Sequence, residues 1–191
     1  MTKAPVNLQE LRRRIYRKAK SEPRHRFWGL FVHITKMETL EEAYCIAKRN
    51  GGAPGIDGQS FDDIENHGRT AFLKAIQEDL VANRYKPKPN RRKDIPKGNG
   101  KVRTLQIPCI RDRVVQGAVK LILEPIFEAD FCTNSYGFRP RCSPHRALAE
   151  VRRSVLRNMS TVIDVDLSRY LDRVPQCPLI HEIAPVDHPL L

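Results

Sequence analysis

Acidic residues are scarce in this chain of 191 residues. Twenty-two Asp and Glu side chains stand against 34 Lys and Arg side chains, which gives a formal net charge of +12. Such an excess favours polyanionic partners, with nucleic acid first and an anionic membrane surface second. A soluble basic protein without such a partner is the alternative that charge alone leaves open.

Patterned cysteines and long apolar runs are lacking as well. The five cysteines form no Cys-x-x-Cys pair, which argues against a zinc site, and an odd, scattered set is typical of a reducing cytoplasm. No uncharged apolar run approaches the length of a membrane span, and no secretory signal is visible. We therefore expect a cytoplasmic protein with no membrane partner.

Basic residues are concentrated in two blocks. Residues 1–26 carry nine basic and two acidic side chains, and residues 86–103 carry eight basic and one acidic. Two such blocks suggest two contacts along a phosphate backbone. The candidate nucleic-acid contacts are Arg12, Arg13, Arg14, Arg17 and Lys18, with Arg113 and Arg139 further along the chain.

The first half of the chain is predicted to be mainly helical. Apolar residues at helical spacing indicate one basic helix over 7–20 and another helix over 70–83. Between them, the capping-box spacing of Thr39 and Glu42 predicts a helix that begins near Thr39 and ends at Gly51-Gly52. The glycines and proline of 52–58 predict a turn-rich loop.

A hairpin, two helices and a strand are predicted in the second half. A Gly-Asn-Gly turn joins extended runs at 92–96 and 101–108. A helix over 112–128, bent at Pro125, and a helix opened by Ser143-Pro144 follow. An apolar strand is predicted at 161–166. This order of elements predicts an α+β fold.

Two carboxylates, Asp164 and Asp166, end the predicted strand and point to the same face of it. They suit Mg²⁺, which needs substrate phosphates or further acids to complete its ligands, but one of them could instead cap a turn. The run Asp164-x-Asp166-x-Ser168 is also similar to the nucleophile strand of haloacid-dehalogenase-like phosphatases, with Asp164 as nucleophile and Asp166 as acid/base. Spacing alone leaves all three interpretations open.

Two cations, Lys97 and Arg103, flank the predicted hairpin tip on opposite strands. A point charge and a planar guanidinium that converge on one anion suit a triphosphate. A charged, solvated ribbon that protects its own edge is the alternative, and it is favoured when the hairpin is considered alone.

Five motifs occur in a fixed order: GGAPGIDG (51–58), IPKGNGKVR (95–103), IPCIRDRVVQ (107–116), SYGFRP (135–140) and VIDVDLSRYLD (162–172). Their order and spacing closely resemble the N-terminal half of bacterial group II intron-encoded reverse transcriptases. The resemblance implies three regions: a basic helical extension (1–50), reverse-transcriptase fingers with a cationic hairpin at 92–108 (51–160), and the first strand of a right-hand palm (161–191), divergent after residue 172.

The resemblance also implies a site. By it, Asp166 and the backbone carbonyl of Leu167 bind catalytic Mg²⁺, while Lys97 and Arg103 hold the triphosphate of an incoming dNTP. Leu171 stands where the family has a Phe that checks the sugar 2′ position. The implied partners are intron RNA, template RNA and a DNA primer.

The family's second metal motif, Tyr-Ala-Asp-Asp, does not occur in the 191 residues. Because two metals need several carboxylates, we expect a truncated part of an RNA-directed DNA polymerase and maturase that is inactive in polymerisation alone. A non-catalytic RNA-binding module that assists intron folding is the alternative, and a remnant that does not fold stably is another. No oligomeric state is predicted.

Overall fold

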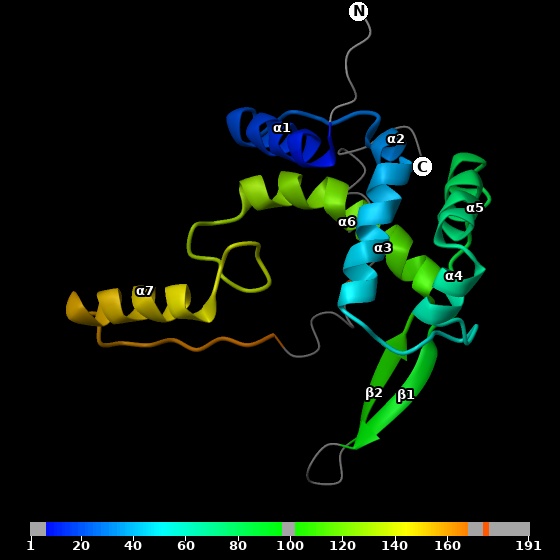
Figure 1. The fold of residues 1–191 in the computed structure, drawn as a ribbon. Coiled ribbons are helices and arrows are strands. Elements are labelled where there is room, and N and C mark those ends of the chain that lie inside the picture. The colour runs from blue at the N-terminus through cyan, green and yellow to red at the C-terminus, as the bar shows by residue number, and fades with distance from the viewer. Residues whose placement is uncertain (1–6, 97–101, 168–173, 176–191) are drawn as a thin grey trace, which may run out of the picture. The chain divides into compact units, whose positions relative to one another are not determined.

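The computed structural model describes residues 7–96, 102–167 and 174–175, and it divides the chain into two compact units. Unit 1 comprises residues 1–15 and 29–125, and unit 2 comprises residues 16–28 and 126–191. The elements are α1 (Leu8–Ser21), α2 (Leu30–Ile34), α3 (Met37–Arg49), α4 (Phe61–His67), α5 (Arg69–Val81), β1 (Arg91–Pro96), β2 (Val102–Ile107), α6 (Ile110–Asp130) and α7 (Pro144–Leu156) (Figure 1). Helices and a two-stranded sheet within the described residues agree with the predicted α+β class.

The core of unit 1 is built on the apolar faces of α3, α5 and α6. Leu40, Tyr44 and Leu73 have no exposed surface, and the Tyr44 ring meets the Phe72 ring edge-on with 6.3 Å between centroids. A Cβ on Gly117 of α6 would lie 3.2 Å from the Cβ of Ala43, so a glycine there lets α3 and α6 approach closely.

The capping box predicted at Thr39 and Glu42 is wrong. Helix α3 begins two residues earlier, with Lys36 as its N-cap and no side-chain cap. Thr39 is buried inside the helix, and its hydroxyl donates a 2.8 Å hydrogen bond to the carbonyl of His33. The short helix α2, which was not predicted from the sequence, places the His33 carbonyl beside Thr39. The Thr39 hydroxyl therefore has its hydrogen-bond partner outside α3.

A real capping box opens α4. The Ser60 hydroxyl accepts from the Asp63 N–H at 3.1 Å, and the Asp63 carboxylate accepts from the Ser60 N–H at 2.8 Å. Hydrogen bonds from the Ser60 side chain and backbone hold the pKa of Asp63 below its usual value. The helix was missed because it spans seven residues, too few for periodicity to show.

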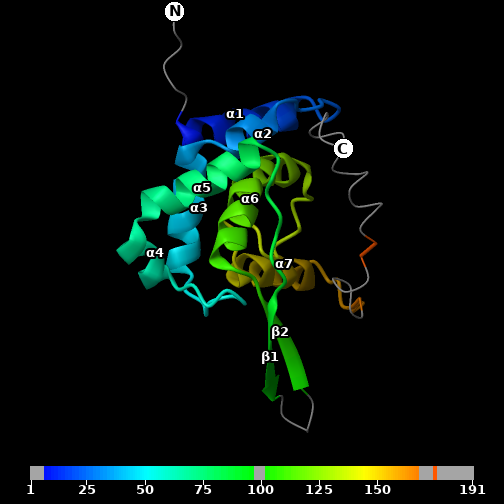
Figure 2. The same ribbon diagram turned by 90° about the vertical axis from the view of Figure 1, so that its right-hand side faces the viewer.

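Strands β1 and β2 form the predicted antiparallel hairpin, with Arg91 opposite Ile107 and Ile95 opposite Arg103. The hairpin projects as an arm beyond helices α3, α4 and α5 of unit 1 (Figures 1 and 2). The turn predicted at its tip lies outside the described residues.

In unit 2, α7 begins as the sequence predicts. Ser143 is the N-cap, its hydroxyl accepts from the Arg146 N–H, and Pro144 follows directly. Its apolar side chains Leu148, Val151 and Val155 are exposed.

The strand predicted at 161–166 is not formed. Residues 161–167 have no regular secondary structure, and all seven are exposed. The only sheet in the described residues is the β1–β2 hairpin, so this β-branched run has no described strand with which to pair its backbone groups. Local propensity alone does not create a strand.

Candidate nucleic-acid interface

Helix α1 separates its cations from its buried residues. Leu8 and Ile15 are buried, whereas Arg13, Arg14 and Arg17 are exposed. At 100° per residue, these three arginines fall on the side of the helix away from Leu8 and Ile15. Among the described residues, neither Arg14 nor Arg17 pairs with a carboxylate, so both guanidinium groups are available to an anion.

The other basic candidates of α1 already have carboxylate partners. Arg12 lies closest to the buried stripe, and its Nη2 is 2.7 Å from Glu124 Oε2 of α6. Lys18 pairs with Glu22 at 2.6 Å, and Arg13 lies 4.0 Å from Glu10. The pairs of Arg13 and Lys18 are exposed and contribute little to stability, so those cations remain open to exchange. Arg12 is held more firmly, because it and Glu124 are both largely shielded.

One face of the hairpin carries positive charge and no negative charge. Residues directly opposite one another on paired strands share a face, so Arg91, Lys93 and Arg103 lie with Ile95, Leu105 and Ile107 on one side. That face carries three positive charges and no acid. On the other face Asp94 accepts a 2.6 Å hydrogen bond from the Thr104 hydroxyl beside Arg92. The predicted anion-binding residue Arg103 is exposed on the cationic face, whereas Lys97 lies outside the described residues.

The base of the hairpin is fixed by Asp112, which is buried in the first turn of α6. Its carboxylate accepts from the Tyr85 hydroxyl at 2.6 Å and from the Lys88 N–H at 3.2 Å. Burial, followed by the bond to Asp112, raises the pKa of the Tyr85 hydroxyl. These bonds anchor the chain that leads into β1.

Arg113 joins two of the sequence motifs within unit 1. Its Nε donates to the Pro108 carbonyl at 3.0 Å and its Nη2 to the Ala53 carbonyl of the glycine-rich loop. A Cβ on Gly52 would lie 2.8 Å from Arg113 Nη1, and a Cβ on Gly55 would lie 2.6 Å from the Cα of Cys109. Gly52 and Gly55 therefore let the loop lie directly against Cys109 and the start of α6.

Asp57 completes this junction. Its pKa is lowered overall: burial acts to raise it, but hydrogen bonds from the Cys109 thiol, Lys88 and the Gln59 N–H outweigh burial. Lys88 Nζ lies 3.4 Å from the carboxylate. The loop, the hairpin approach and α6 are thus joined by charge-assisted bonds.

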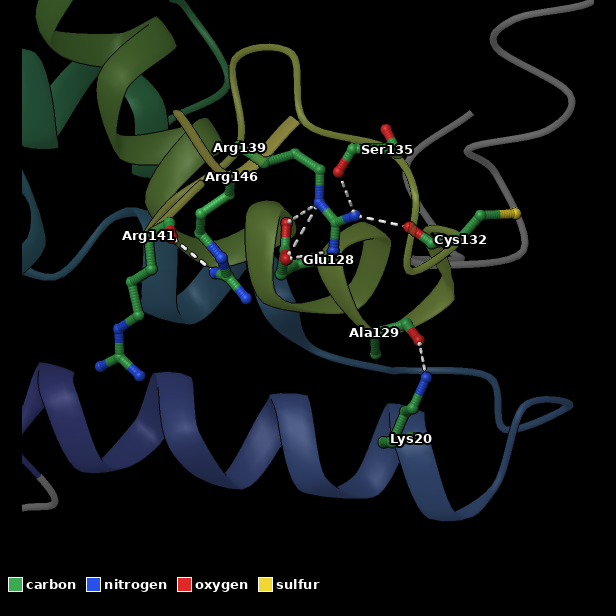
Figure 3. A network of polar contacts seen from close by, with 8 residues as sticks. All are labelled: Lys20, Glu128, Ala129, Cys132, Ser135, Arg139, Arg141 and Arg146. Carbon is green, nitrogen blue, oxygen red and sulfur yellow. Dashed lines mark hydrogen bonds and ion pairs between the residues drawn. The ribbon is translucent and has the colours of Figure 1, made fainter. Parts of the chain in front are cut away.

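Arg139 is the centre of a network in unit 2 (Figure 3). Its guanidinium bonds both carboxylate oxygens of Glu128, the shortest contact being 2.6 Å, and donates at 2.7 Å to the carbonyls of Cys132 and Ser135. It also lies over the Phe131 ring, 5.1 Å from the centroid. Glu128 raises the pKa of Arg139. These contacts hold the loop that contains SYGFRP against the end of α6.

Arg12, Arg113 and Arg139 were predicted as nucleic-acid contacts, and the structure places them with internal partners. Arg12 pairs with a carboxylate, Arg113 binds two backbone carbonyls, and Arg139 does both. Their roles in nucleic-acid binding stay predictions. In the structure they position the helices and loops that carry the exposed cations.

The predicted metal residues do not form a metal site on their own. Asp164, Asp166 and Leu167 are exposed on the irregular segment 161–167. Within the described part of the chain, no three His, Cys, Asp or Glu side chains are grouped so that they could hold a metal ion. Two carboxylates hold Mg²⁺ only with substrate phosphates or further acids, so the Mg²⁺ role expected of Asp166 and Leu167 stays a prediction. Leu171 lies outside the described residues.

Sequence reasoning missed the connecting role of Asp57, Tyr85 and Asp112. Both acids belong to motifs that were recognised, but nothing local distinguishes them from surface acids. Their partners come from segments more than twenty residues away, which no short-range sequence pattern can indicate.

No helix in the described residues is both long and apolar enough to cross a bilayer.

Comparison with known proteins finds several similar sequences. The chain is 40% identical over 174 residues to protein YkfC of Escherichia coli, which covers 87% of this chain and 45% of that protein. It is 32% identical over 157 residues to the group II intron-encoded protein LtrA of Lactococcus lactis, 81% of this chain and 25% of LtrA. A shorter match, 40% identical over 78 residues, covers 39% of this chain and 11% of nuclear intron maturase 1 of Arabidopsis thaliana.

The chain spans less than half the length of each of these relatives. No family model matches it. The likeness predicted from five motifs is confirmed by these relatives, which extend it well beyond the motifs themselves. Over most of its length, the chain is homologous to the group II intron-encoded protein LtrA.

Proposed function

We propose that this chain supplies the fingers-type part of a group II intron reverse transcriptase and maturase, and that its own activity is to bind RNA. The observation that carries the proposal is the cationic face of the hairpin, with Arg91, Lys93 and Arg103 and no acid. The exposed Arg14 and Arg17 of α1 add a second contact. The relationship to intron-encoded proteins makes intron RNA the favoured polyanion.

The same proposal assigns the hairpin to the triphosphate of an incoming dNTP in a polymerising assembly. Arg103 lies at the end of β2 nearest the tip, with its fork exposed. A planar guanidinium binds phosphate oxygens in pairs, which suits this role. Template RNA and a DNA primer would then be partners of that assembly.

Polymerisation by these 191 residues alone is not proposed. Two-metal nucleotidyl transfer needs several carboxylates around both ions. Asp164 and Asp166 are exposed without a third described acid beside them, and Tyr-Ala-Asp-Asp is absent from the sequence. We propose instead that the chain assists the folding of intron RNA, for which binding alone suffices.

The test is the binding of a structured intron RNA by the full chain, measured by fluorescence anisotropy between about 50 and 200 mM salt. We expect the affinity to fall steeply with salt. A Lys93→Ala/Arg103→Ala variant should bind more weakly, whereas Arg92→Ala, on the other hairpin face, should bind more nearly like wild type. Affinity that is constant across this range would overturn the proposal. Primer extension on an RNA template with Mg²⁺ should yield no product.

A further inference from the structure

The ring of Phe138, in the loop between α6 and α7, has an unusual setting. Its side chain is fully exposed, and its backbone has φ = 55°. Bulky residues rarely adopt this left-handed conformation, because Cβ crowds the following carbonyl. Strained positions of this kind persist only where the surroundings determine them, and they are concentrated at functional sites.

The surroundings of Phe138 do determine it. The next residue, Arg139, is fixed by Glu128 and by the carbonyls of Cys132 and Ser135, all within unit 2 (Figure 3). The Cys142 N–H closes a turn onto the Arg139 carbonyl at 3.3 Å. Arg141 is also left-handed, with φ = 60°, and its carbonyl accepts from Arg146 Nη1 at 3.0 Å. The exposure of the ring is therefore part of an anchored loop.

The electrostatic setting is positive. Residues 131–160 hold six arginines and one acid, Glu150, which pairs with Arg153. Arg139 is occupied by Glu128, but among the described residues Arg141, Arg146, Arg152 and Arg157 have no carboxylate partner. Arg141 points away from the Arg139–Glu128 contact in Figure 3. A fully exposed aromatic ring in a region where four arginines have no described carboxylate partner suits a ligand with a flat apolar surface and negative charge.

We propose that Phe138 is a stacking platform for an unpaired nucleobase of bound RNA, with the phosphates beside that base held by the arginines of the same loop and of α7. This inference rests on the proposed RNA-binding function. A base has a π-face and a phosphate on either side of it, so it matches both features. In a duplex the bases are already stacked, and an A-form helix presents mainly its backbone and shallow groove.

The experiment compares an unpaired RNA of about 12 nucleotides, carrying one 2-aminopurine, with the duplex of the same sequence. The full chain and Phe138→Ala, Phe138→Gly and Phe138→Trp variants are titrated. We expect Phe138→Ala to bind the unpaired RNA about 5- to 100-fold more weakly and the duplex unchanged. Phe138→Trp should retain affinity for the unpaired RNA, and 2-aminopurine fluorescence should be quenched by wild type and Trp but not by Ala.

Phe138→Gly separates stacking from folding. Because glycine adopts positive φ without strain, this variant should unfold at or above the wild-type temperature while losing affinity as Ala does. Equal binding of the unpaired RNA by wild type, Ala and Gly would overturn the stacking role and leave RNA binding intact. If wild type binds neither RNA in a salt-dependent way, RNA binding and the stacking role both fail.

Discussion

The side chains of Tyr85 and Asp112 are joined by a hydrogen bond of 2.6 Å, which ties the approach to the hairpin to the first turn of α6. Asp112 is 2% exposed and also accepts from the Lys88 N–H. The cationic arm is therefore anchored to the core by a carboxylate of the IPCIRDRVVQ motif.

Replacing Asp112 with Ala should lower the free energy of unfolding by about 1–3 kcal/mol, because two donors lose their buried acceptor. Denaturant titration should show a lower midpoint with an unchanged slope. The matched variant Tyr85→Phe removes one donor and should cost less. In the double variant the losses should be less than additive, since the two residues share one bond. An unchanged midpoint for Asp112→Ala would contradict this role.

Replacing Gly55 with Ala should also destabilise the protein, by about 1–3 kcal/mol. The added methyl would lie 2.6 Å from the Cα of Cys109, so loop or helix must shift. Gly137→Ala is the control, because a Cβ there meets nothing within 4 Å. Thermal melts of both variants check this, and equal melting temperatures would show that the loop is not packed against α6.

The arginines of α1 should separate into binding and structural groups. Arg14→Ala/Arg17→Ala should keep the stability of wild type but weaken RNA binding, and reduce the slope of log affinity against log salt by roughly 1.4–1.8. Arg12→Ala should instead lower stability, because the ion pair between Arg12 and Glu124 is lost. Melting curves and salt titrations on the same three proteins distinguish the groups. A double variant with the wild-type salt slope would exclude α1 from the interface.

Arg139→Lys should destabilise the loop before α7 although the charge is kept. An ammonium group cannot reach Glu128 and the carbonyls of Cys132 and Ser135 together, and we expect a loss of about 1.5–3 kcal/mol. Arg141→Lys, at an exposed position of the same loop, should leave unfolding unchanged. Identical unfolding curves for both substitutions would mean that the guanidinium network is dispensable.

Ionisation of Tyr44 should lower the stability of the protein at alkaline pH. Burial and then the bond to Glu65 raise the pKa of Tyr44 from its ordinary value of 10.0 to about 12. The folded state thus holds the phenol proton more tightly, so this contribution is complete below pH 10 and is lost as pH rises towards 12. Denaturant midpoints across this range should decline less steeply for Tyr44→Phe than for wild type. Parallel declines would show that Tyr44 does not contribute to the loss of stability.

Elements with local signals could be predicted from sequence. The α1 periodicity, the hairpin and the Ser143-Pro144 start of α7 depend on residues a few positions apart, and all three form. The α+β class followed from them. Helices α2 and α4 were missed because five and seven residues are too short for a period to appear.

The interface was harder to predict, because charge shows where cations are but not which of them have partners. Arg113 and Arg139 look like surface arginines in the sequence, yet each binds carbonyls of a loop. Every residue has a backbone carbonyl, so the sequence does not show which carbonyl an arginine will bind. The strand expected at 161–166 failed for a related reason, since a strand requires a partner that no single segment specifies.

The division of the chain bears on how it can be handled experimentally. The boundaries at residues 15/16 and 125/126 fall inside α1 and α6, so each unit is assembled from two separate stretches of sequence. A simple terminal deletion cannot yield either unit whole, and a cut at these points would open a helix rather than a linker. Expression of one unit alone calls for a rearranged gene in which its two stretches are rejoined by a designed connection.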